Sequence, residues 1–169
     1  MADMTSEREL ATALLAACRD RGIMLATAES CTGGLVAAAL TAIPGASDVV
    51  DRGFVTYSYP SKTALLGVPT ALLAAHGAVS EPVARAMAEG ALAASAAGLA
   101  LSITGVAGPG GSEAKPEGLV HFACARTGVP TLHARHEFGA LGRDIVRSLS
   151  VRTALSLGLQ ALGRTAQPE

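Results

Sequence analysis

The chain has 169 residues, a formal net charge of −1 and a pI near 6.4, which gives no electrostatic reason to expect a nucleic-acid or membrane partner. Half of the residues are hydrophobic and only 3% are aromatic, so we expect one domain over residues 1–169 with a core of small aliphatic side chains. The polar N-terminus is unlike a signal peptide, and no apolar run reaches the roughly 18 residues of a membrane span.

Apolar periodicity predicts helices and strands that alternate through most of the chain. Helices are expected at residues 5–20, 33–42, 60–66, 69–76, 82–97 and 141–163. Strands are expected at residues 23–28, 48–57, 99–104, 117–126 and 130–138, with a possible bulge at Gly53. Helices between sequence-adjacent strands indicate an α/β fold, a three-layer α/β/α sandwich. The final pair of strands, joined by a short turn, indicates a mixed, mostly parallel central sheet.

The most informative stretch is residues 27–34, Thr-Ala-Glu-Ser-Cys-Thr-Gly-Gly, which joins an apolar strand to an apolar helix. Such a turn exposes a hydroxyl, here that of Ser30, and directs unpaired helix N–H groups to the same point. This geometry suits a nucleophile beside an oxyanion hole, or a phosphate site, and makes Thr32, Gly33 and Gly34 candidate binding residues. The alternative is an ordinary strand–helix turn with Ser or Thr as the N-cap.

Three polar, glycine-bearing segments are expected to converge at one edge of the sheet, because sites in such folds lie beyond the carboxyl ends of strands. The segments are residues 29–34, 54–62 and 102–112. They bring together the Ser30 hydroxyl, the Tyr57 phenol, the Lys62 amine and two loops rich in backbone N–H groups. A serine with a neutral lysine as its base is a hydrolase arrangement that needs neither metal nor histidine.

The lysine content strengthens this interpretation. The chain contains 11 Arg and only two Lys, Lys62 and Lys115. A desolvated lysine can lose its proton, whereas arginine effectively cannot, so a position that keeps Lys is a candidate base. Lys115 lies in a predicted loop, and we interpret it as a lysine that is retained by chance.

Cys31 is the rival nucleophile, since it neighbours Ser30 at the same turn, but none of the three segments holds a histidine to activate it. The three cysteines have no CxxC spacing, which favours reduced thiols in a cytoplasmic protein. Residues 104–111 resemble a dinucleotide-binding loop only faintly, because Pro109 replaces a required glycine. No set of histidines, cysteines and carboxylates has metal-ligand spacing, so we expect no metal.

Four sequence blocks together resemble the CinA C-terminal domain family. They are residues 27–34, residues 52–58 with Lys62, residues 76–83 and residues 104–109. The resemblance extends from about residue 5 to residue 160. Characterised members are nicotinamide-nucleotide amidohydrolases, or NMN deamidases. The resemblance therefore implies a three-layer fold and hydrolysis of nicotinamide mononucleotide to nicotinate mononucleotide and ammonia, without metal or organic cofactor. Larger members carry a further N-terminal domain linked to nucleotide pyrophosphatase activity. We expect that activity to be absent.

Carried over residue by residue, the family's nucleophile falls on Ser30, its lysine on Lys62 and its tyrosine on Tyr57. In this interpretation a lysine with a depressed pKa deprotonates Ser30, while Tyr57 relays a proton or holds the lysine. The helix-start N–H groups near Thr32 and Gly33 stabilise the oxyanion. The substrate phosphate then binds the amides of Thr104 and Gly105 and the side chain of Arg143.

The resemblance leaves two questions open. The loop at residues 108–112 is one residue shorter than the usual form, and residues 118–120 read Gly-Leu-Val in place of Gly-Thr-Val, so loop geometry and affinity are expected to differ. The alternative function is a non-catalytic mononucleotide-binding or regulatory module, which the same glycine loops would serve.

We also expect a homodimer or higher homo-oligomer. The apolar content is high for a small domain, and the predicted helix at residues 82–97 offers few charged faces. The family resemblance indicates the same, and allows Arg143 to reach the site of a neighbouring subunit.

Overall fold

The computed structural model describes residues 6–165 and builds them around one five-stranded sheet. The helices are α1 Glu7–Asp20, α2 Leu35–Thr41, α3 Tyr59–Leu66, α4 Thr70–His76, α5 Glu81–Ala93 and α6 Arg143–Leu162, with a 3₁₀ turn η1 at Ala46–Asp48. The strands are β1 Leu25–Glu29, β2 Val50–Val55, β3 Leu99–Gly105, β4 Leu119–Arg126 and β5 Val129–Glu137.

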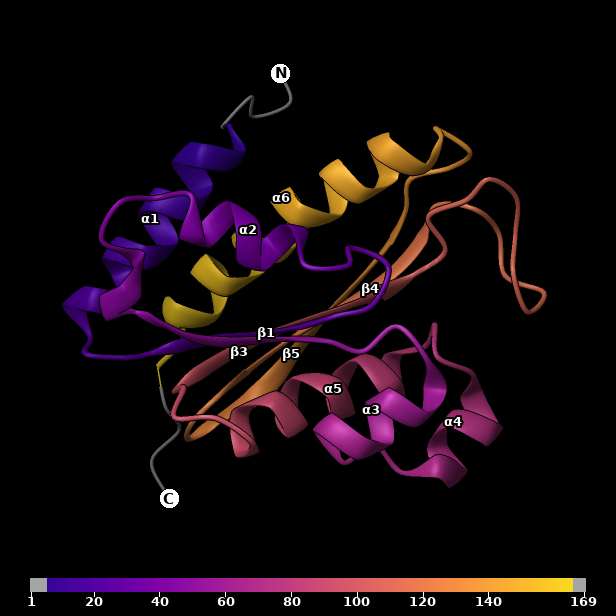
Figure 1. Cartoon of the computed structure of the whole chain (residues 1–169), viewed down its shortest axis with the longest axis horizontal. Helices are drawn as coiled ribbons and strands as arrows, with labels where there is room; N and C mark the ends of the chain where they lie inside the picture. The colour runs from indigo at the N-terminus through magenta and orange to yellow at the C-terminus, as the bar shows by residue number, and fades with distance from the viewer. Residues whose placement is uncertain (1–5, 166–169) are drawn as a thin grey trace.

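Helices cover both faces of the sheet, which confirms the predicted three-layer α/β/α sandwich. Figure 1 shows α1, α2 and α6 on one face and α3, α4 and α5 on the other. Each predicted helix and strand is present, with ends that differ by up to four residues. The largest difference is α5, which was expected to continue to residue 97 but ends at Ala93. The expected start of the first helix, residue 5, lies outside the described residues, as do residues 1–4 of the N-terminal stretch.

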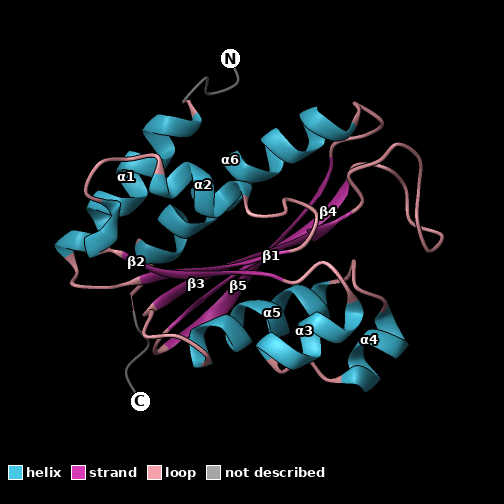
Figure 2. Ribbon diagram, viewed as in Figure 1, coloured by secondary structure: helices cyan, strands magenta, loops and turns pink. Residues whose placement is uncertain are grey.

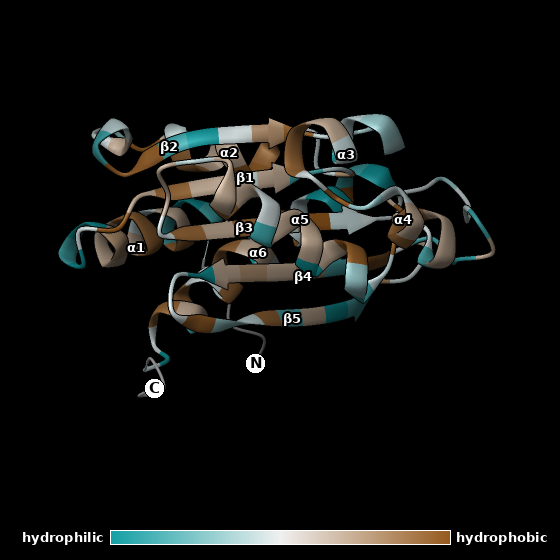
Figure 3. Cartoon of the chain, turned by 90° about the horizontal axis from the view of Figure 1, so that it is seen from below, coloured by the Kyte–Doolittle hydropathy of each residue, from teal (hydrophilic) through white to brown (hydrophobic). Residues whose placement is uncertain are grey.

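The strand order is β2-β1-β3-β4-β5. β1 pairs in parallel with β2 and β3, whereas the β3–β4 and β4–β5 pairs are antiparallel. The sheet is therefore mixed as predicted, with β4 the one strand of the described sheet that runs against the others. Figure 3 shows the five strands in this order behind the layer of α3, α4 and α5.

The predicted bulge at Gly53 is wrong. The register irregularity lies between Leu25 and Ala26 of β1, which pair with Val50 and Arg52, and Gly53 pairs regularly with Thr27. Gly53 has a packing role instead. A Cβ there would lie 2.8 Å from the Thr27 hydroxyl and 3.2 Å from Ala37 Cβ, so the glycine lets α2 approach the sheet closely.

The core occupies both faces of the sheet, with one large cluster on the side of α1, α2 and α6 and two smaller clusters on the side of α5. Every residue of β1 is buried, as are the first six of β3, because helices cover both faces of these strands. On the α5 face the helices approach closely: a Cβ on Gly90 of α5 would overlap the Leu66 carbonyl oxygen at the end of α3. This contact fixes α3, and therefore Lys62, against the body of the domain.

The carboxyl ends of β1, β2 and β3 point toward the same edge of the sheet, as the parallel pairings require. A long connection between β3 and β4 projects beyond this edge, and Figure 2 shows it without helix or strand over most of its length. Within residues 6–165 no helix combines the length and hydrophobicity that a membrane crossing requires.

Candidate active site

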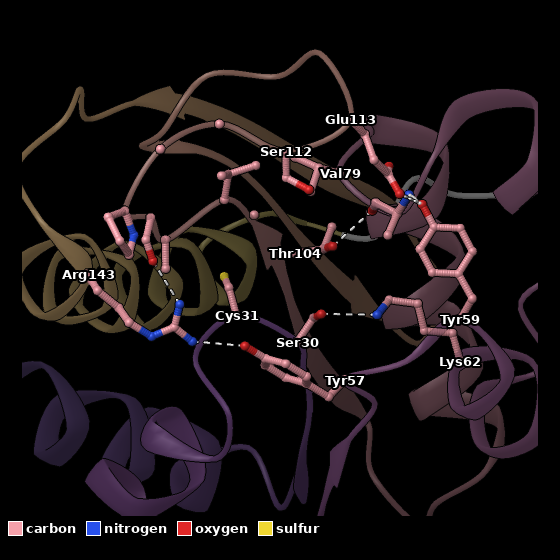
Figure 4. Close-up of a pocket in the computed structure, with 18 residues that line it drawn as sticks. Ser30, Cys31, Tyr57, Tyr59, Lys62, Val79, Thr104, Ser112, Glu113 and Arg143 are labelled. Carbon is pink, nitrogen blue, oxygen red and sulfur yellow. Dashed lines mark hydrogen bonds between the residues drawn. The ribbon is translucent and has the colours of Figure 1, made fainter.

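A cavity of about 320 Å³ opens at this edge of the sheet. Six of the nine predicted site residues line it: Ser30, Tyr57, Lys62, Thr104, Gly105 and Arg143. The lining also includes Cys31, Tyr59 and Glu113, together with much of the glycine-rich loop after β3 (Figure 4). The three polar segments predicted to converge therefore do meet.

Ser30 follows β1 directly and is held by its backbone on both sides. Its N–H donates to the Ile103 carbonyl of β3 at 2.9 Å, and its own carbonyl accepts the Gly33 N–H at 3.0 Å. The strand and the turn thus fix the main chain, while the side chain points toward Lys62 (Figure 4). The Ser30 side chain is almost buried but still lines the cavity.

Lys62 lies in the first turns of α3 with its side chain 0% exposed. Its Nζ lies 3.0 Å from Ser30 Oγ and donates to the Thr56 carbonyl at 2.6 Å. Burial lowers the pKa of Lys62 from 10.5 to about 8. Because the Thr56 carbonyl can only accept, it binds one N–H and leaves the lone pair of a neutral amine free to face the serine hydroxyl.

Cys31 borders the cavity beside Ser30, but its chemistry is unfavourable for attack. Burial raises the pKa of the Cys31 thiol to about 12. The thiolate, not the thiol, is the nucleophilic form, so this cysteine remains inert near neutral pH. Cys18 and Cys124 are also buried free thiols.

Thr32, Gly33 and Gly34 lie behind the Ser30 turn and are not among the residues that line the cavity. The Gly33 N–H is already bound to the Ser30 carbonyl, and the side chain of Thr32 is completely buried. The first free amides of α2, those of Val36 and Ala37, donate to the buried carboxylate of Glu29 at 2.9 and 3.0 Å. The N-terminus of α2 is therefore capped by the Glu29 side chain and does not face the cavity.

Sequence reasoning assigned no role to Glu29 or Arg147, and both support the nucleophile turn. Arg147 of α6 donates to the carbonyls of Cys31 and Thr32, each at 3.2 Å. The acceptors are main-chain carbonyls more than 110 residues earlier, which leave no pattern in the sequence.

Tyr57 and Arg143 pair with each other at the rim of the cavity. Arg143 donates to the Tyr57 hydroxyl at 2.8 Å and to the Gly108 carbonyl at 2.9 Å. Tyr57 is 61% exposed and its hydroxyl points toward Arg143, away from Lys62 (Figure 4). The expectation that Tyr57 holds the lysine is therefore replaced: the Thr56 carbonyl holds it.

Thr104 and Gly105 end β3 and form the floor of the cavity. The Thr104 hydroxyl donates to the Ala78 carbonyl at 2.8 Å. A Cβ on Gly105 would lie 2.7 Å from a Val120 methyl group, so the glycine permits close pairing with β4.

The wall opposite Arg143 contains polar residues that the sequence interpretation did not select. The Tyr59 hydroxyl donates to Glu113, and Lys115 donates to the carbonyls of His76 and Val79. The interpretation of Lys115 as a lysine retained by chance does not account for these contacts. Both lysines of the chain make hydrogen bonds at the cavity or at its wall.

No group of three or more His, Cys, Asp and Glu side chains within residues 6–165 is arranged to hold a metal ion. Two histidines of the sheet, His121 and His133, contact each other, with ring nitrogens 2.9 Å apart. Glu81 lies 3.5 Å from the second nitrogen of His133. Burial and the neighbouring His133 lower the pKa of His121 to about 4, so the pair is a neutral hydrogen-bonded contact.

Comparison with known proteins identifies the family. The family model described as the CinA C-terminal domain matches residues 7–162. The chain belongs to this family. A CinA-like protein from Anaeromyxobacter sp. (strain Fw109-5) is 50% identical over 153 residues, covering 90% of this chain and 37% of the relative. This chain thus spans about a third of the length of the curated CinA relatives it matches.

Two solved structures have the same fold over nearly the whole chain. The competence/damage inducible protein CihA from Agrobacterium tumefaciens has a TM-score of 0.90 and 48% identity, covering 97% of this chain and 100% of that one. A CinA superfamily protein from Escherichia coli has a TM-score of 0.90 and 38% identity, covering 95% and 93%.

Proposed function

We propose that this CinA domain hydrolyses the carboxamide of nicotinamide mononucleotide to nicotinate mononucleotide and ammonia, with Ser30 as nucleophile and Lys62 as base. One observation carries the proposal: a completely buried lysine lies 3.0 Å from a serine hydroxyl that lines the cavity. A buried lysine with a pKa lowered to about 8 is a competent base near neutral pH. The resemblance of the sequence blocks supplies the substrate.

In the acylation step, Lys62 Nζ takes the Ser30 proton while Oγ forms a bond to the carboxamide carbon. The resulting ammonium then returns a proton to the departing nitrogen as the C–N bond breaks, and ammonia leaves. Thr56 holds the amine in place through both transfers, because its carbonyl binds one N–H throughout. The same residue thus serves as base and then as acid.

In the deacylation step, water replaces ammonia at the acyl carbon. Lys62 takes a proton from the water as its oxygen attacks the ester, and the Ser30 oxygen leaves and is reprotonated. The products are free Ser30 and the nicotinate carboxyl group. No redox partner is needed, because hydrolysis replaces the C–N bond of the amide with a C–O bond and no atom changes its oxidation state.

The tetrahedral intermediate of each step carries an oxyanion. We assign its stabilisation to the backbone N–H of Cys31, because Cys31 follows the nucleophile directly and is one of the residues that line the cavity. Donors of this kind each contribute about 10²–10³ in rate. This assignment replaces the N–H groups near Thr32 and Gly33, which lie behind the turn.

The substrate phosphate is assigned to Arg143 at the rim. A guanidinium group has five N–H donors, and the Tyr57 hydroxyl and the Gly108 carbonyl each accept one. Within residues 6–165 the remaining donors have no hydrogen-bond partner, and we assign them to a phosphate in the two-pronged manner that arginine favours. Tyr57 orients the guanidinium group in this scheme.

The decisive experiment measures ammonia and nicotinate mononucleotide together after the purified protein is mixed with nicotinamide mononucleotide. We expect the two products in a 1:1 ratio over many turnovers, and release at least about 10³-fold slower with Ser30→Ala. Nicotinamide riboside, which lacks the phosphate, serves as the control for the Arg143 assignment and should react poorly. Tight binding of the mononucleotide without ammonia release would contradict the proposal and favour the non-catalytic binding module.

A further inference from the structure

Lys115 joins the long loop after β3 to a separate part of the fold. Its Nζ donates to the carbonyls of His76 at 2.8 Å and Val79 at 2.6 Å. His76 is the last residue of α4, so the ammonium group lies at the carbonyl end of that helix, where a cation is favoured. A compact ammonium group can serve two carbonyls from a point between them, which the planar fork of arginine is less suited to do.

A second link lies beside the first. The Tyr59 hydroxyl donates to the Glu113 carboxylate and accepts the Ala78 N–H at 3.0 Å. Burial and the bond to Glu113 raise the pKa of Tyr59, so the phenol remains a donor. Lys115 thus binds the short segment of residues 76–79 directly, and Glu113 is linked to the same segment through the Tyr59 hydroxyl. We call Lys115, Glu113 and Tyr59 the clamp.

Gly77 lies at the centre of the clamp and leaves no room for a side chain. A Cβ there would lie 2.8 Å from Glu113 Oε2 and 3.0 Å from Lys115 Nζ. Gly77 also has a φ of +71°, which an L side chain rarely adopts. The clamp residues therefore rest directly on the bare main chain of this segment.

The clamp matters because the loop that it anchors forms one wall of the cavity. Residues 108–113 all line the cavity and belong to no helix or strand. Glu117, which lies just before β4, holds the loop by accepting the Gly110 N–H at 2.7 Å. Figure 4 shows Glu113 and Tyr59 on the side of the cavity opposite Arg143. The clamp thus sets how far this wall lies from Ser30.

We propose that Lys115, Glu113 and Tyr59 are positioning residues that fix the width of the cavity and so set its affinity for the mononucleotide. The inference rests on the proposed function for the identity of the substrate. Within residues 6–165 the hydrogen bonds of the Ser30 and Lys62 side chains do not involve the clamp, because Lys62 binds the Ser30 hydroxyl and the Thr56 carbonyl. Loss of the clamp should therefore raise KM and leave kcat largely unchanged.

The first test replaces Lys115 with Met, which keeps the length of the side chain and removes its charge and donors. We expect KM for nicotinamide mononucleotide to rise about tenfold or more, as loss of a charge-assisted contact predicts, with kcat within about threefold of wild type. Lys115→Arg, which keeps the charge, should recover part of the affinity. A fall in kcat at constant KM would overturn the proposal.

The second test compares two glycines that both have a positive φ. Gly77→Ala forces a side chain into the clamp, whereas Gly67→Ala places one at a similar φ of +66° with no atom within 4 Å. Gly67 has a ψ of +20°, in the left-handed helical region, whereas Gly77 has a ψ of +165°, in a region that only glycine adopts readily, so Gly77→Ala also carries the larger backbone strain. Thermal unfolding of both variants measures this strain separately from KM. Only Gly77→Ala should raise KM. Equal KM values in the two variants would show that the clamp does not set affinity.

A binding measurement separates this proposal from the proposed function. Calorimetric titration of nicotinamide mononucleotide into Ser30→Ala, with and without Lys115→Met, needs no turnover. A Kd that rises about tenfold with Lys115→Met supports the clamp even if wild type releases no ammonia, which would sink the function alone. Ammonia release with unchanged Kd and KM in Lys115→Met would sink the clamp alone.

Discussion

Two adjacent side chains at one turn, Ser30 and Cys31, offer alternative nucleophiles, and their surroundings distinguish them. The Ser30 hydroxyl lies within proton-transfer distance of a buried amine. The Cys31 thiol has a pKa raised to about 12 by burial, which keeps it protonated. The intrinsic reactivity of a thiolate is therefore of no use at this position.

Exchange of each side chain for alanine tests this choice. Ser30→Ala should lower kcat by about 10³-fold or more, because the covalent route is lost. Cys31→Ala should keep most of the activity, since only a small buried side chain is removed. Initial rates of ammonia release from both variants decide the matter. An inactive Cys31→Ala protein beside an active Ser30→Ala protein would reverse the assignment.

The charge state of Lys62 predicts the pH dependence of the reaction. The active form is the neutral amine, and the pKa is lowered to about 8, so kcat/KM should rise with pH and level off above about pH 8. Lys62→Arg keeps a positive charge but cannot deprotonate, so it should be as damaging as Lys62→Ala. A flat profile, or an active Arg variant, would assign Lys62 a purely electrostatic role.

At the scale of elements, the short helix α2 depends on a buried carboxylate from the neighbouring strand. Its N-cap is Gly34, which has no side chain to cap the helix. Glu29, completely buried at the end of β1, accepts the two free amides in its place. Strand, nucleophile turn and helix are thereby joined into one unit.

Glu29→Gln should therefore destabilise the domain. The amide that replaces one carboxylate oxygen cannot accept a hydrogen bond, which leaves a buried N–H unpaired at a cost of about 1–3 kcal/mol. Chemical denaturation measures this loss. Glu89→Gln is the control, because Glu89 is bound to Thr131 at an exposed position and should change the free energy of unfolding by less than about 0.5 kcal/mol. Equal stability of the two variants would contradict the capping role.

The contrast between Ser30 and its supports indicates what a sequence can predict at this scale. Ser30 follows the buried strand β1 and Lys62 comes after the edge strand β2, and the rule that the ends of parallel strands meet at one edge is enough to bring them together. Arg147, Lys115 and the Thr56 carbonyl were missed because the contacts involve main-chain carbonyls, which any residue can supply. The bulge was misplaced for a similar reason: Gly53 serves a close helix contact, which local sequence does not distinguish from a break in register.

For the whole molecule, the expectation of a homo-oligomer remains a proposal, but its basis changes. The apolar face of α5 is covered within the chain, since Val83, Met87 and Ala91 are buried. The exposed large apolar side chains lie elsewhere. Five of them come from the start of α2, the end of β2 with the residues after it, and the start of α6: Leu35, Val55, Tyr57, Leu141 and Ile145. These elements border the nucleophile turn and the rim of the cavity.

We propose that a second copy of the chain covers this rim, as exposed apolar patches near a site often indicate. The Arg143 contacts with Tyr57 and Gly108 place its guanidinium group at the cavity of its own chain. If the exposed apolar side chains at the rim are covered by a second copy, sedimentation should find a dimer at micromolar concentration. Ile145→Asp, which puts a charge among these side chains, should weaken the dimer. A strict monomer at that concentration would contradict the proposal.

Mixing of two inactive variants then decides where Arg143 acts. Chains that carry Ser30→Ala lack the nucleophile, and chains that carry Arg143→Ala lack the phosphate contact. If each Arg143 serves its own cavity, both sites of a mixed dimer remain defective, and mixing adds nothing to the summed activities. If Arg143 acted across the interface, the site that retains Ser30 would receive the arginine of the other chain. Activity well above the sum of the two variants would therefore contradict the contacts within one chain as the functional arrangement.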